Sequence, residues 1–510
     1  MLKKYIISSF RVFFNNIGKL EIDLFTHNGK GSSLYVFEND SVVILLKSSY
    51  DVDLEFFENY LEDFYKYLKN TFFAIKYSKH ENTLNIITDY FGLESVYYTR
   101  QSDGLVISPL IYHLNKYDVD ISLLKEHLTL GYTSNQKSIF KGCEIFKKQR
   151  IYEINSDLTL RENKYLQSFK LENEEFSNSL IDSSKKSLIK DLKKTKNLNF
   201  GITAGKDSLA LVSCALDSKL NIKTSNFGIK SSHDVKIGYE VSKSLSLDYQ
   251  HFDYSDIGEF NFFSKLIAYY SSGLATSSYV DMLKYVYHMN TDDSFVIGEG
   301  GECVRIFYVD EDIFKKYITP KYITDAIFNE IDYKFLDQFN TNKESIIHLG
   351  INYYRNQRLT NNFSKRHSIL TPFINKITPF LNLDFVRITY SLPLEVYRSE
   401  IFHNYLSDLN DTVSEKYNID SKINDTQVWS KRLDTVRDSF LKVHEEFDYE
   451  QLGMNKEGVD FCLKIMDENK RTIYFILRLH TLILFINNFK TSEFKLLEKE
   501  LTNLKFYKKK

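Results

Sequence analysis

The segment at positions 197–216, NLNFGITAGKDSLALVSCAL, constrains the fold of this chain more than any other stretch. Its pattern predicts a strand over residues 198–202, a tight polar loop over residues 203–207 and a helix that opens at Ser208. A turn from a buried strand into a helix leaves backbone N–H groups unpaired, and the helix dipole places partial positive charge behind them. The segment therefore predicts an anion site of the kind that holds phosphate groups.

The small and hydroxyl-bearing residues of this loop suit a bound phosphate. Ala204 and Gly205 let the backbone approach a phosphate group closely. Thr203 and Ser208 supply hydroxyl groups that can donate hydrogen bonds to it. We therefore expect these four residues to contact the phosphates of a nucleotide.

Lys206 and Asp207 give the loop its charges. Lys206 can neutralise phosphate charge, with a solvated surface position as the alternative. Asp207 by itself would repel a phosphate, so a carboxylate at this position indicates Mg²⁺ between the two. The loop is not a P-loop ending in GK[ST], because the spacing differs and Asp follows the Lys.

The run ITAGKDS resembles the SGGxDS pyrophosphate loop of the ATP pyrophosphatases, which adenylate a substrate. Thr203 stands for the usual Ser, and Ala204 stands for the usual first Gly. The resemblance implies a parallel, Rossmann-like sheet that binds ATP and Mg²⁺. An ordinary strand–turn–helix is the alternative for a match of this length, so the rest of the chain decides between the two.

The composition indicates an ordinary soluble globular chain with room for two or more domains. Of its 510 residues, 43% are hydrophobic and 26% are charged. The formal net charge of −2 argues against a general nucleic-acid binder. The four cysteines lack CxxC or zinc-type spacing, which indicates a reducing compartment, and we expect a cytoplasmic location. We expect no signal peptide and no membrane span, since the apolar run at 473–485 contains Arg478 and His480 and predicts a buried helix.

Residues 1–165 predict a layered antiparallel α/β domain. Short β-rich segments are interrupted there by two helical stretches, at 54–70 and 122–130. The clearest expected strands are 33–38, 41–47, 72–77 and 84–88.

Two runs in this region resemble class II glutamine amidotransferase domains, which implies an Ntn-hydrolase-like fold. DYFGLESVYY is similar to their DRFGxxPLYY stretch, and SIFKGCEIF is similar to the TIFxGIxxL run that closes the domain. The glutaminase of that family uses an N-terminal Cys as nucleophile. Here Leu2 holds that position and the first cysteine is Cys143, so we expect a degenerate domain without glutaminase activity.

Residues 172–490 resemble the ligase domain of the asparagine synthetase family. Strand, loop and helix patterns alternate, which predicts a doubly wound parallel sheet with a helical C-terminal part. A second strand is expected over residues 222–229, and the family resemblance assigns Phe227 and Gly228 to the adenine. Asp234 is expected to cap the helix that follows.

A second phosphate-type loop, VIGEGGEC, follows another expected buried strand. It resembles the family pattern SGEGxDExxGG. The resemblance assigns Gly298 to nucleotide binding and Glu302 to the magnesium ion, which Asp207 would also bind. It assigns Glu299 to the amine, whose proton a carboxylate can accept. Cys303 departs from the pattern and puts the identity of the substrate in doubt.

The C-terminal part carries the last candidate site residue. PFLNLDFV resembles a family run and is expected to be mostly structural. Lys422 lies roughly where the family has a Lys that stabilises the amide-forming transition state, with Lys431 as its rival and a solvated surface Lys as the alternative for either. Residues 491–510 are expected to form an exposed charged tail.

These resemblances predict an ATP-dependent carbon–nitrogen ligase that forms an acyl-adenylate, releases AMP and pyrophosphate, and makes an amide. Its substrate would be a small-molecule or peptide carboxylate. The amine would be free ammonia, ammonia from a partner, or an amine of the substrate, as in the β-lactam synthetases and lasso-peptide macrolactam cyclases. Amidation of a sugar acid, an ammonia-dependent asparagine synthetase, and a non-catalytic nucleotide-binding regulatory protein are the alternatives.

Overall fold

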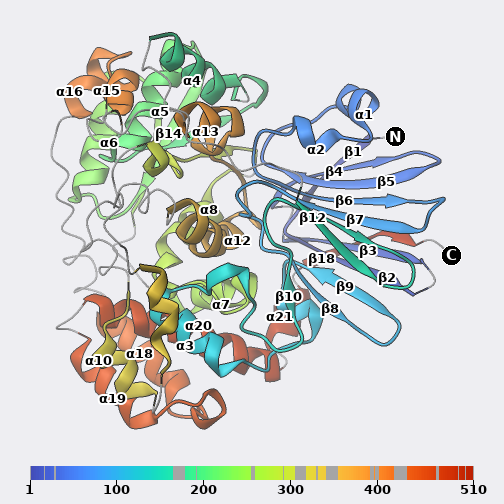
Figure 1. Cartoon of the computed structure of the whole chain (residues 1–510). Helices are drawn as coiled ribbons and strands as arrows, with labels where there is room; N and C mark the ends of the chain where they lie inside the picture. Colours follow the sequence, from blue (N-terminus) through green and yellow to red (C-terminus); the bar gives the residue numbers. More distant parts are fainter. Residues whose placement is uncertain are drawn as a thin grey trace.

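The computed structural model combines two antiparallel sheets, one parallel sheet and a large set of helices (Figure 1). The two antiparallel sheets pack together on the right of the view in Figure 1, and the parallel sheet and most helices lie on the left. The structure describes residues 2–16, 18–27, 30–164, 178–190, 192–253, 259–290, 292–304, 318–328, 331–339, 354–390, 396, 401–417, 433–466, 470–491, 493–499 and 501–508.

The first antiparallel sheet has seven strands from the N-terminal region. The strands expected from the sequence are confirmed as β4, β5, β6 and β7 at its centre. In spatial order the sheet is β1 (Leu2–Ile7), β4 (Ser32–Glu38), β5 (Val42–Ser48), β6 (Phe72–Ser78), β7 (Thr83–Thr88), β11 (Arg150–Ile154) and β12 (Leu160–Lys164).

The second antiparallel sheet has six strands and takes one of them from the C-terminal end of the chain. Its spatial order is β10 (Glu144–Ile145), β8 (Tyr97–Arg100), β9 (Gly104–Ser108), β2 (Ser9–Asn15), β3 (Leu20–His27) and β18 (Leu501–Lys508).

Alternate side chains of the two sheets face each other and form one core. Val12 and Phe14 of β2 and Val43 and Leu45 of β5 are among them, and all four are buried. The intervening residues of β4–β6 face α1 (Leu54–Tyr60) and α2 (Phe64–Tyr67) through a separate core that includes Phe57. Successive residues of these strands therefore lie in different cores, and nearly all of them are buried, because the sheet is covered on both faces.

Strand β18 corrects the expected exposed tail over residues 491–510. Leu501–Lys508 pairs antiparallel with β3, and the preceding helix α21 (Glu493–Lys499) buries Phe494 completely. Residues 501–508 therefore form the edge strand of this sheet. Lysines are common on edge strands, so the Lys-rich composition of this segment suits that position.

The third sheet is parallel throughout, and its order is β15-β14-β13-β16-β17. Its strands are β13 (Leu198–Gly201), β14 (Ile222–Phe227), β15 (Asp248–Phe252), β16 (Ser294–Val296) and β17 (Asn375–Ile377). The chain builds outward from β13 in one direction and then returns to add β16 and β17 on the other side. This arrangement is a doubly wound sheet whose switch point lies between β13 and β16.

Helix α20 (Lys470–Lys490) forms the centre of the C-terminal helical region, where it packs against α7 (Phe260–Ser271) and α18 (Leu433–His444). Within α20, 20 residues (Arg471–Lys490) are long and apolar enough to cross a membrane by length and composition, and 78% of the apolar 18-residue window within them is buried inside the protein. Packing against the other helices therefore accounts for its apolar character, as the sequence predicted.

Candidate functional site

The two loops that the sequence singled out meet at the switch point of the parallel sheet. One follows β13 and leads into α5 (Lys206–Asp217), and the other follows β16 and leads into the 3₁₀ helix η5 (Gly301–Val304). Since β13 and β16 are paired neighbours in parallel register, both loops leave the same edge of the sheet. Open parallel sheets bind their ligands at this place.

Glycines bring the second loop into direct contact with Asp207. A Cβ atom at Gly298 would lie 2.8 Å from the Asp207 Cβ, and one at Gly301 would lie 2.3 Å from Asp207 Oδ1. Gly300 has a φ of +99° and is crowded by Leu381, so it too excludes a side chain. The glycines of GEGG are therefore required for the approach of the two loops.

Side chains already order the first half of the Thr203–Ser208 loop. The Thr203 N–H donates to Ser208 Oγ at 3.1 Å, the Gly205 N–H donates to Thr203 Oγ1 at 3.0 Å, and the Ala204 N–H donates to Asp234 Oδ1 at 2.9 Å. The sequence predicted these N–H groups as phosphate donors. They are instead engaged within the protein, and Thr203 and Ser208 act first as internal braces of the loop.

Asp234 corrects one expectation about the helix that follows β14. Ser232 is the N-cap of α6 (His233–Ser244), because its side chain accepts the N–H of Val235. Asp234 lies in the first turn instead and reaches across to the Ala204 N–H. The side chain thus ties the starts of two helices together at the carboxyl edge of the sheet.

Asp207 has a buried histidine partner that sequence reasoning missed. His403 Nε2 lies 2.7 Å from Asp207 Oδ1, and His403, on α15 (Ile401–Ser407), is completely buried. The side chain of Asp207 is 16% exposed. No periodic or spacing signal in the sequence links these two positions, because the contact is made by packing of α15 against α5.

Asp207 and Glu302 are the carboxylates that the sequence assigned to Mg²⁺. Glu302 is half-buried in η5, directly after Gly301, which touches Asp207. Among the described residues, no group of three or more His, Cys, Asp or Glu side chains could hold a metal ion. Two carboxylates at the junction suit the kind of Mg²⁺ that is held by one or two protein carboxylates and by substrate phosphates.

Glu299 is the centre of a buried ion-pair cluster. Arg366 Nη2 lies 2.5 Å from Oε1, and the Lys376 ammonium contacts Oε2; the three side chains are between 0% and 18% exposed. Burial disfavours the Glu299 carboxylate, but the charges of Arg366 and Lys376 lower its pKa to about 2. A carboxylate that holds two cations so firmly is a weak proton acceptor, so this geometry favours a structural role over the predicted contact with the amine.

Arg366 also interacts electrostatically with Glu302. Burial opposes the charge of the guanidinium, yet Glu299 and more weakly Glu302 raise the pKa of Arg366. The two acidic residues of the GEGGE loop therefore lie within electrostatic reach of the same side chain. Sequence reasoning missed Arg366 and Lys376, which come from α12 (Ser364–Leu370) and β17.

A second buried cluster joins α12 to the antiparallel sheets. Glu94 lies 2.7 Å from Lys47 Nζ on β5 and 2.8 Å from His367 Nε2 on α12. Burial opposes ionisation of Glu94, but its neighbours lower its pKa to about 2. Burial lowers the pKa of His367, against the opposing effect of Glu94. The charge of Lys47 is the largest of the effects that keep Glu94 ionised. Consecutive residues of α12 thus contact the GEGGE loop and the N-terminal sheets.

The predicted adenine contacts lie at the same sheet edge. Phe227 ends β14, and its ring is 5.1 Å from that of Tyr285. Gly228 has a φ of +131°, its N–H donates to the Phe252 carbonyl at 3.1 Å, and its own carbonyl lies 2.9 Å from His251 Nε2.

Lys206 is half-buried at the start of α5. Lys422 and its rival Lys431 lie outside the described residues.

The DYFG run of the N-terminal region is structural. Asp89 is buried; its Oδ1 accepts the N–H groups of Phe91 and Gly92 at 2.7 and 2.5 Å, and its Oδ2 accepts the N–H of Phe72 at 2.8 Å. Gly92 has a φ of +64°, which completes the turn. These hydrogen bonds therefore hold the turn by which the chain leaves β7.

The described cysteine thiols are not built as nucleophiles. Cys143, Cys214 and Cys462 are all buried, and burial raises the pKa of each thiol to about 12. A nucleophilic cysteine needs the opposite shift and access to substrate. Leu2 lies in β1, paired with Phe37 of β4.

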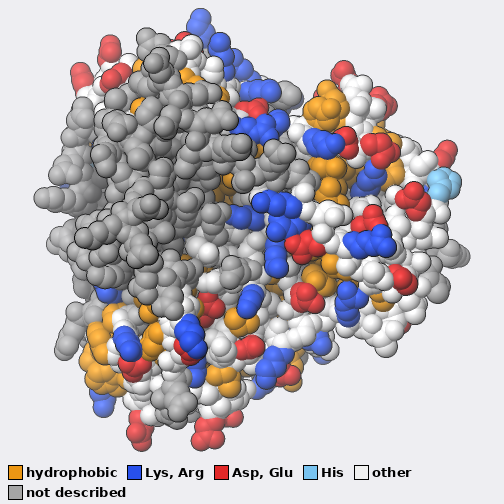
Figure 2. Space-filling model, viewed as in Figure 1, with side chains coloured by type: hydrophobic (Ala, Val, Ile, Leu, Met, Phe, Trp, Pro, Cys, Tyr) orange, Lys and Arg blue, Asp and Glu red, His pale blue; other side chains and the backbone are white. Residues whose placement is uncertain are grey.

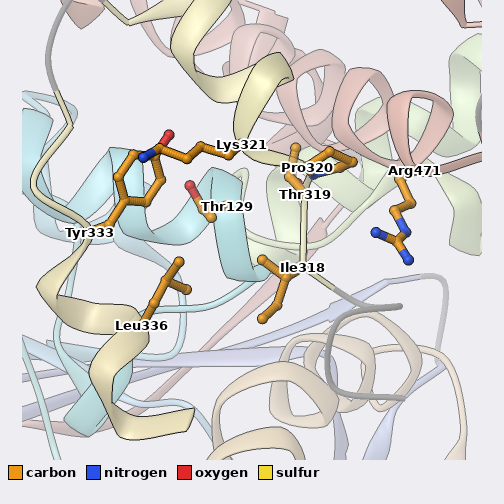
Figure 3. A pocket seen from close by; sticks show the side chains of 8 residues that line it. All are labelled: Thr129, Ile318, Thr319, Pro320, Lys321, Tyr333, Leu336 and Arg471. Carbon is orange, nitrogen blue, oxygen red and sulfur yellow. The ribbon is translucent and has the colours of Figure 1, made fainter. Parts of the chain in front are cut away.

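A pocket of about 250 Å³ lies elsewhere, between the end of α3 (Ile121–Leu130), the start of α10 (Lys321–Ile327) and the start of α20 (Figure 3). It contains none of the predicted site residues. Its walls are Thr129, Ile318, Thr319, Pro320, Lys321, Tyr333, Leu336 and Arg471.

On the visible face of the N-terminal sheets, basic and acidic side chains are interspersed (Figure 2), in keeping with the net charge of −2.

Comparisons with known proteins found similarity only at the level of solved structures. No family model matches the chain, and no curated protein matches its sequence. One similar structure is the glutamine phosphoribosylpyrophosphate amidotransferase of B. subtilis complexed with ADP and GMP, at 11% identity over 48% of this chain and 59% of that chain, with a TM-score of 0.20. Another is described as the allosteric regulatory enzyme of purine biosynthesis, at 8% identity over 49% of this chain and 75% of that chain, also with a TM-score of 0.20. The chain spans less than two thirds of the first protein's length, and at these scores neither similarity bears on function.

Proposed function

We propose that the chain is an ATP-dependent carbon–nitrogen ligase that activates a carboxylate as an acyl-adenylate. The observation that carries the proposal is the contact of Gly298 and Gly301 with Asp207. It joins two glycine-bearing acidic loops at the switch point of a parallel sheet, where nucleotides bind in this architecture. We assign the N-terminal sheets to a degenerate, Ntn-hydrolase-like amidotransferase domain.

In the proposed reaction, a carboxylate oxygen of the substrate attacks the α-phosphorus of ATP, and pyrophosphate leaves. An amine then attacks the acyl carbon, loses a proton and expels AMP as the amide forms. Asp207 and Glu302 are the residues that would hold the Mg²⁺ ion, which shields the charge of the leaving pyrophosphate. Phe227 and Gly228 would border the adenine.

We propose that the nitrogen does not come from glutamine, because Leu2 stands at the position of the nucleophilic Cys of the amidotransferases, and the thiols of Cys143, Cys214 and Cys462 are buried with pKa values raised to about 12. An amine of the substrate, as in macrolactam or β-lactam formation, and ammonia, free or from a partner, are the two remaining sources. Sugar acids and peptides are the carboxylates to be tested first.

A non-catalytic nucleotide-binding protein is the second candidate. The observations that favour it are the engagement of both oxygens of Glu299 and of the N–H groups of Thr203, Ala204 and Gly205 within the protein. Such a protein would bind Mg·ATP without turning it over.

One experiment separates the two candidates. Purified protein is incubated with ATP, Mg²⁺ and radiolabelled pyrophosphate, with panels of amino acids, sugar acids and short peptides. Carboxylate-dependent exchange of label into ATP supports the ligase. Binding of Mg·ATP in calorimetry with no exchange on any panel, and none with cell extract as the carboxylate source, supports the binding protein.

A further inference from the structure

His403 lies outside the two loops, and burial and aromatic contacts restrict its side chain. Its ring packs against Phe380, with centroids 5.8 Å apart, and against its neighbour Phe402, with centroids 6.4 Å apart. The side chain has no solvent exposure. These contacts restrict the ring, and its Nε2 lies 2.7 Å from Asp207 Oδ1.

The hydrogen bond has a defined direction. His403 Nδ1 is buried and has no hydrogen-bond partner among the described residues. A proton on Nδ1 would therefore be buried without an acceptor, which is costly. Nε2, which faces the carboxylate oxygen, therefore carries a proton and donates it to Asp207 Oδ1.

Gly301 lies against the same oxygen, since a Cβ atom there would be 2.3 Å from Oδ1. Phe380 packs against the same turn, because its Cβ lies 3.2 Å from the Cβ position of Gly300. One short segment, η8 (Pro379–Leu381), thus supports both the GEGG turn and the His403 ring. Oδ1 therefore contacts both the His403 donor and the GEGG turn, which restricts the movement of the carboxylate.

We propose that His403 is a positioning residue for Asp207: its Nε2–H holds Oδ1 so that the carboxylate is presented in one orientation to the magnesium ion of a bound nucleotide. The inference rests on the proposed nucleotide site. Residues that orient metal-binding carboxylates in this way change metal affinity by about 10- to 100-fold when they are replaced.

The test compares variants at position 403 with a matched histidine elsewhere. H403F keeps an aromatic ring against Phe380 and Phe402 but removes the donor, whereas H403Q keeps an N–H donor at the ε position. His444 provides the control, since it is also buried and its Nε2 lies 2.7 Å from the carboxylate of Asp460, far from the two loops. H403M, which removes the donor from a flexible side chain, replaces H403F if that variant does not fold.

The readout is Mn²⁺ affinity in the presence of a non-hydrolysable ATP analogue, measured by electron paramagnetic resonance on folded protein. We expect the dissociation constant for Mn²⁺ to rise about 10- to 100-fold in H403F and H403M, with H403Q and H444F within about threefold of the natural chain. Unchanged Mn²⁺ affinity in folded H403F, or in folded H403M where H403F does not fold, would overturn the role of His403 while leaving the nucleotide site in place. Failure of the unmodified protein to bind Mn²⁺ with the analogue would overturn both the proposed function and this inference.

Discussion

Gly301 lies directly against the carboxylate of Asp207, so that a Cβ atom at position 301 would be 2.3 Å from Oδ1. The two residues belong to loops that follow different strands of the parallel sheet, and their contact makes one site from two separate sequence segments. The orientation of Asp207 therefore depends on the absence of a side chain at position 301.

The G301A substitution tests this dependence. The added methyl group has to displace Asp207 or the GEGG turn, and overpacking of this kind costs about 1–3 kcal/mol of stability. We expect Mg·ATP affinity, measured by calorimetry, to fall by up to about 100-fold, because small displacements of positioning groups are costly. G104A is the comparison, since a Cβ there would be similarly crowded, 2.6 Å from Phe13, but in the antiparallel sheets rather than at the two loops. Equal affinities in the two variants would contradict a role for the close approach.

A comparison of D207N with D207A separates the effect of Asp207 on pyrophosphate release from its effect on the stability of the fold. D207A leaves the buried His403 donor without its acceptor, so we expect a loss of about 1–3 kcal/mol in the free energy of unfolding. D207N keeps an acceptor oxygen for His403 but removes the charge that would bind Mg²⁺. We therefore expect D207N to melt close to the natural chain and to release no pyrophosphate. Pyrophosphate release at the natural rate in D207N would remove this loop from the proposed reaction.

The N-terminal region is expected to produce no glutamate from glutamine. The thiols of Cys143, Cys214 and Cys462 are buried, and burial raises the pKa of each to about 12, so these groups are almost entirely protonated at neutral pH. Iodoacetamide should leave these three cysteines unmodified in the native protein and label them after unfolding, as read by peptide mass spectrometry. Glutamate formation that persists through further purification would show that another residue supplies a nucleophile.

Much of the fold followed from local pattern. The strand–loop–helix at β13 and the glycine-rich turn after β16 were found because apolar runs that end in small and acidic residues mark the carboxyl ends of buried strands. The alternation in β4–β7 was equally readable. Pattern placed the acidic loops in chain order but could not show that Gly301 touches Asp207, since that contact depends on sheet order.

The partners of the acidic residues were beyond sequence reasoning for a physical reason. The sequence pattern around each of these partners predicts only a helix or a strand and gives no sign of an acidic neighbour. The contacts of His403, Arg366 and Lys376 with their carboxylates are made by tertiary packing of segments far apart in the chain. The same holds for β18, whose Lys-rich sequence indicated a tail because its pairing partner, β3, lies at the opposite end of the chain.

AMP and pyrophosphate are the expected products of ATP turnover. The loop from Thr203 to Ser208 resembles those that hold pyrophosphate as it leaves the α-phosphorus, so cleavage is expected between the α and β phosphates. Chromatography of the nucleotides after incubation with an active carboxylate should show AMP in equal amount to the amide. ADP and inorganic phosphate would place the protein in a different class of ligase.

The E299Q substitution distinguishes a structural Glu299 from one that accepts the amine proton. Gln cannot neutralise Arg366 and Lys376, and breaking a buried ion pair costs about 3–5 kcal/mol. The pKa of Glu299 is lowered from 4.5 to about 2 in the folded chain by these two cations, against the opposing effect of burial. The unfolded chain therefore binds more protons between these pH values, and the ion pairs stabilise the fold fully above about pH 4.5 and lose that effect as the pH falls toward 2. Urea unfolding should show a difference between the natural chain and E299Q that is large at pH 7 and shrinks over this window.

Glu94 supplies the matched control for this prediction, because its pKa is also lowered to about 2, by Lys47 and His367 against the opposing effect of burial. E94Q should destabilise the protein in the same pH-dependent way, yet Glu94 contacts neither acidic loop in the described structure. If Glu299 is structural, both variants should lose pyrophosphate exchange and amide formation together, in proportion to their loss of folded protein. If E299Q alone retains exchange but forms amide about 10²–10⁴-fold more slowly, Glu299 accepts the amine proton despite its two cationic partners.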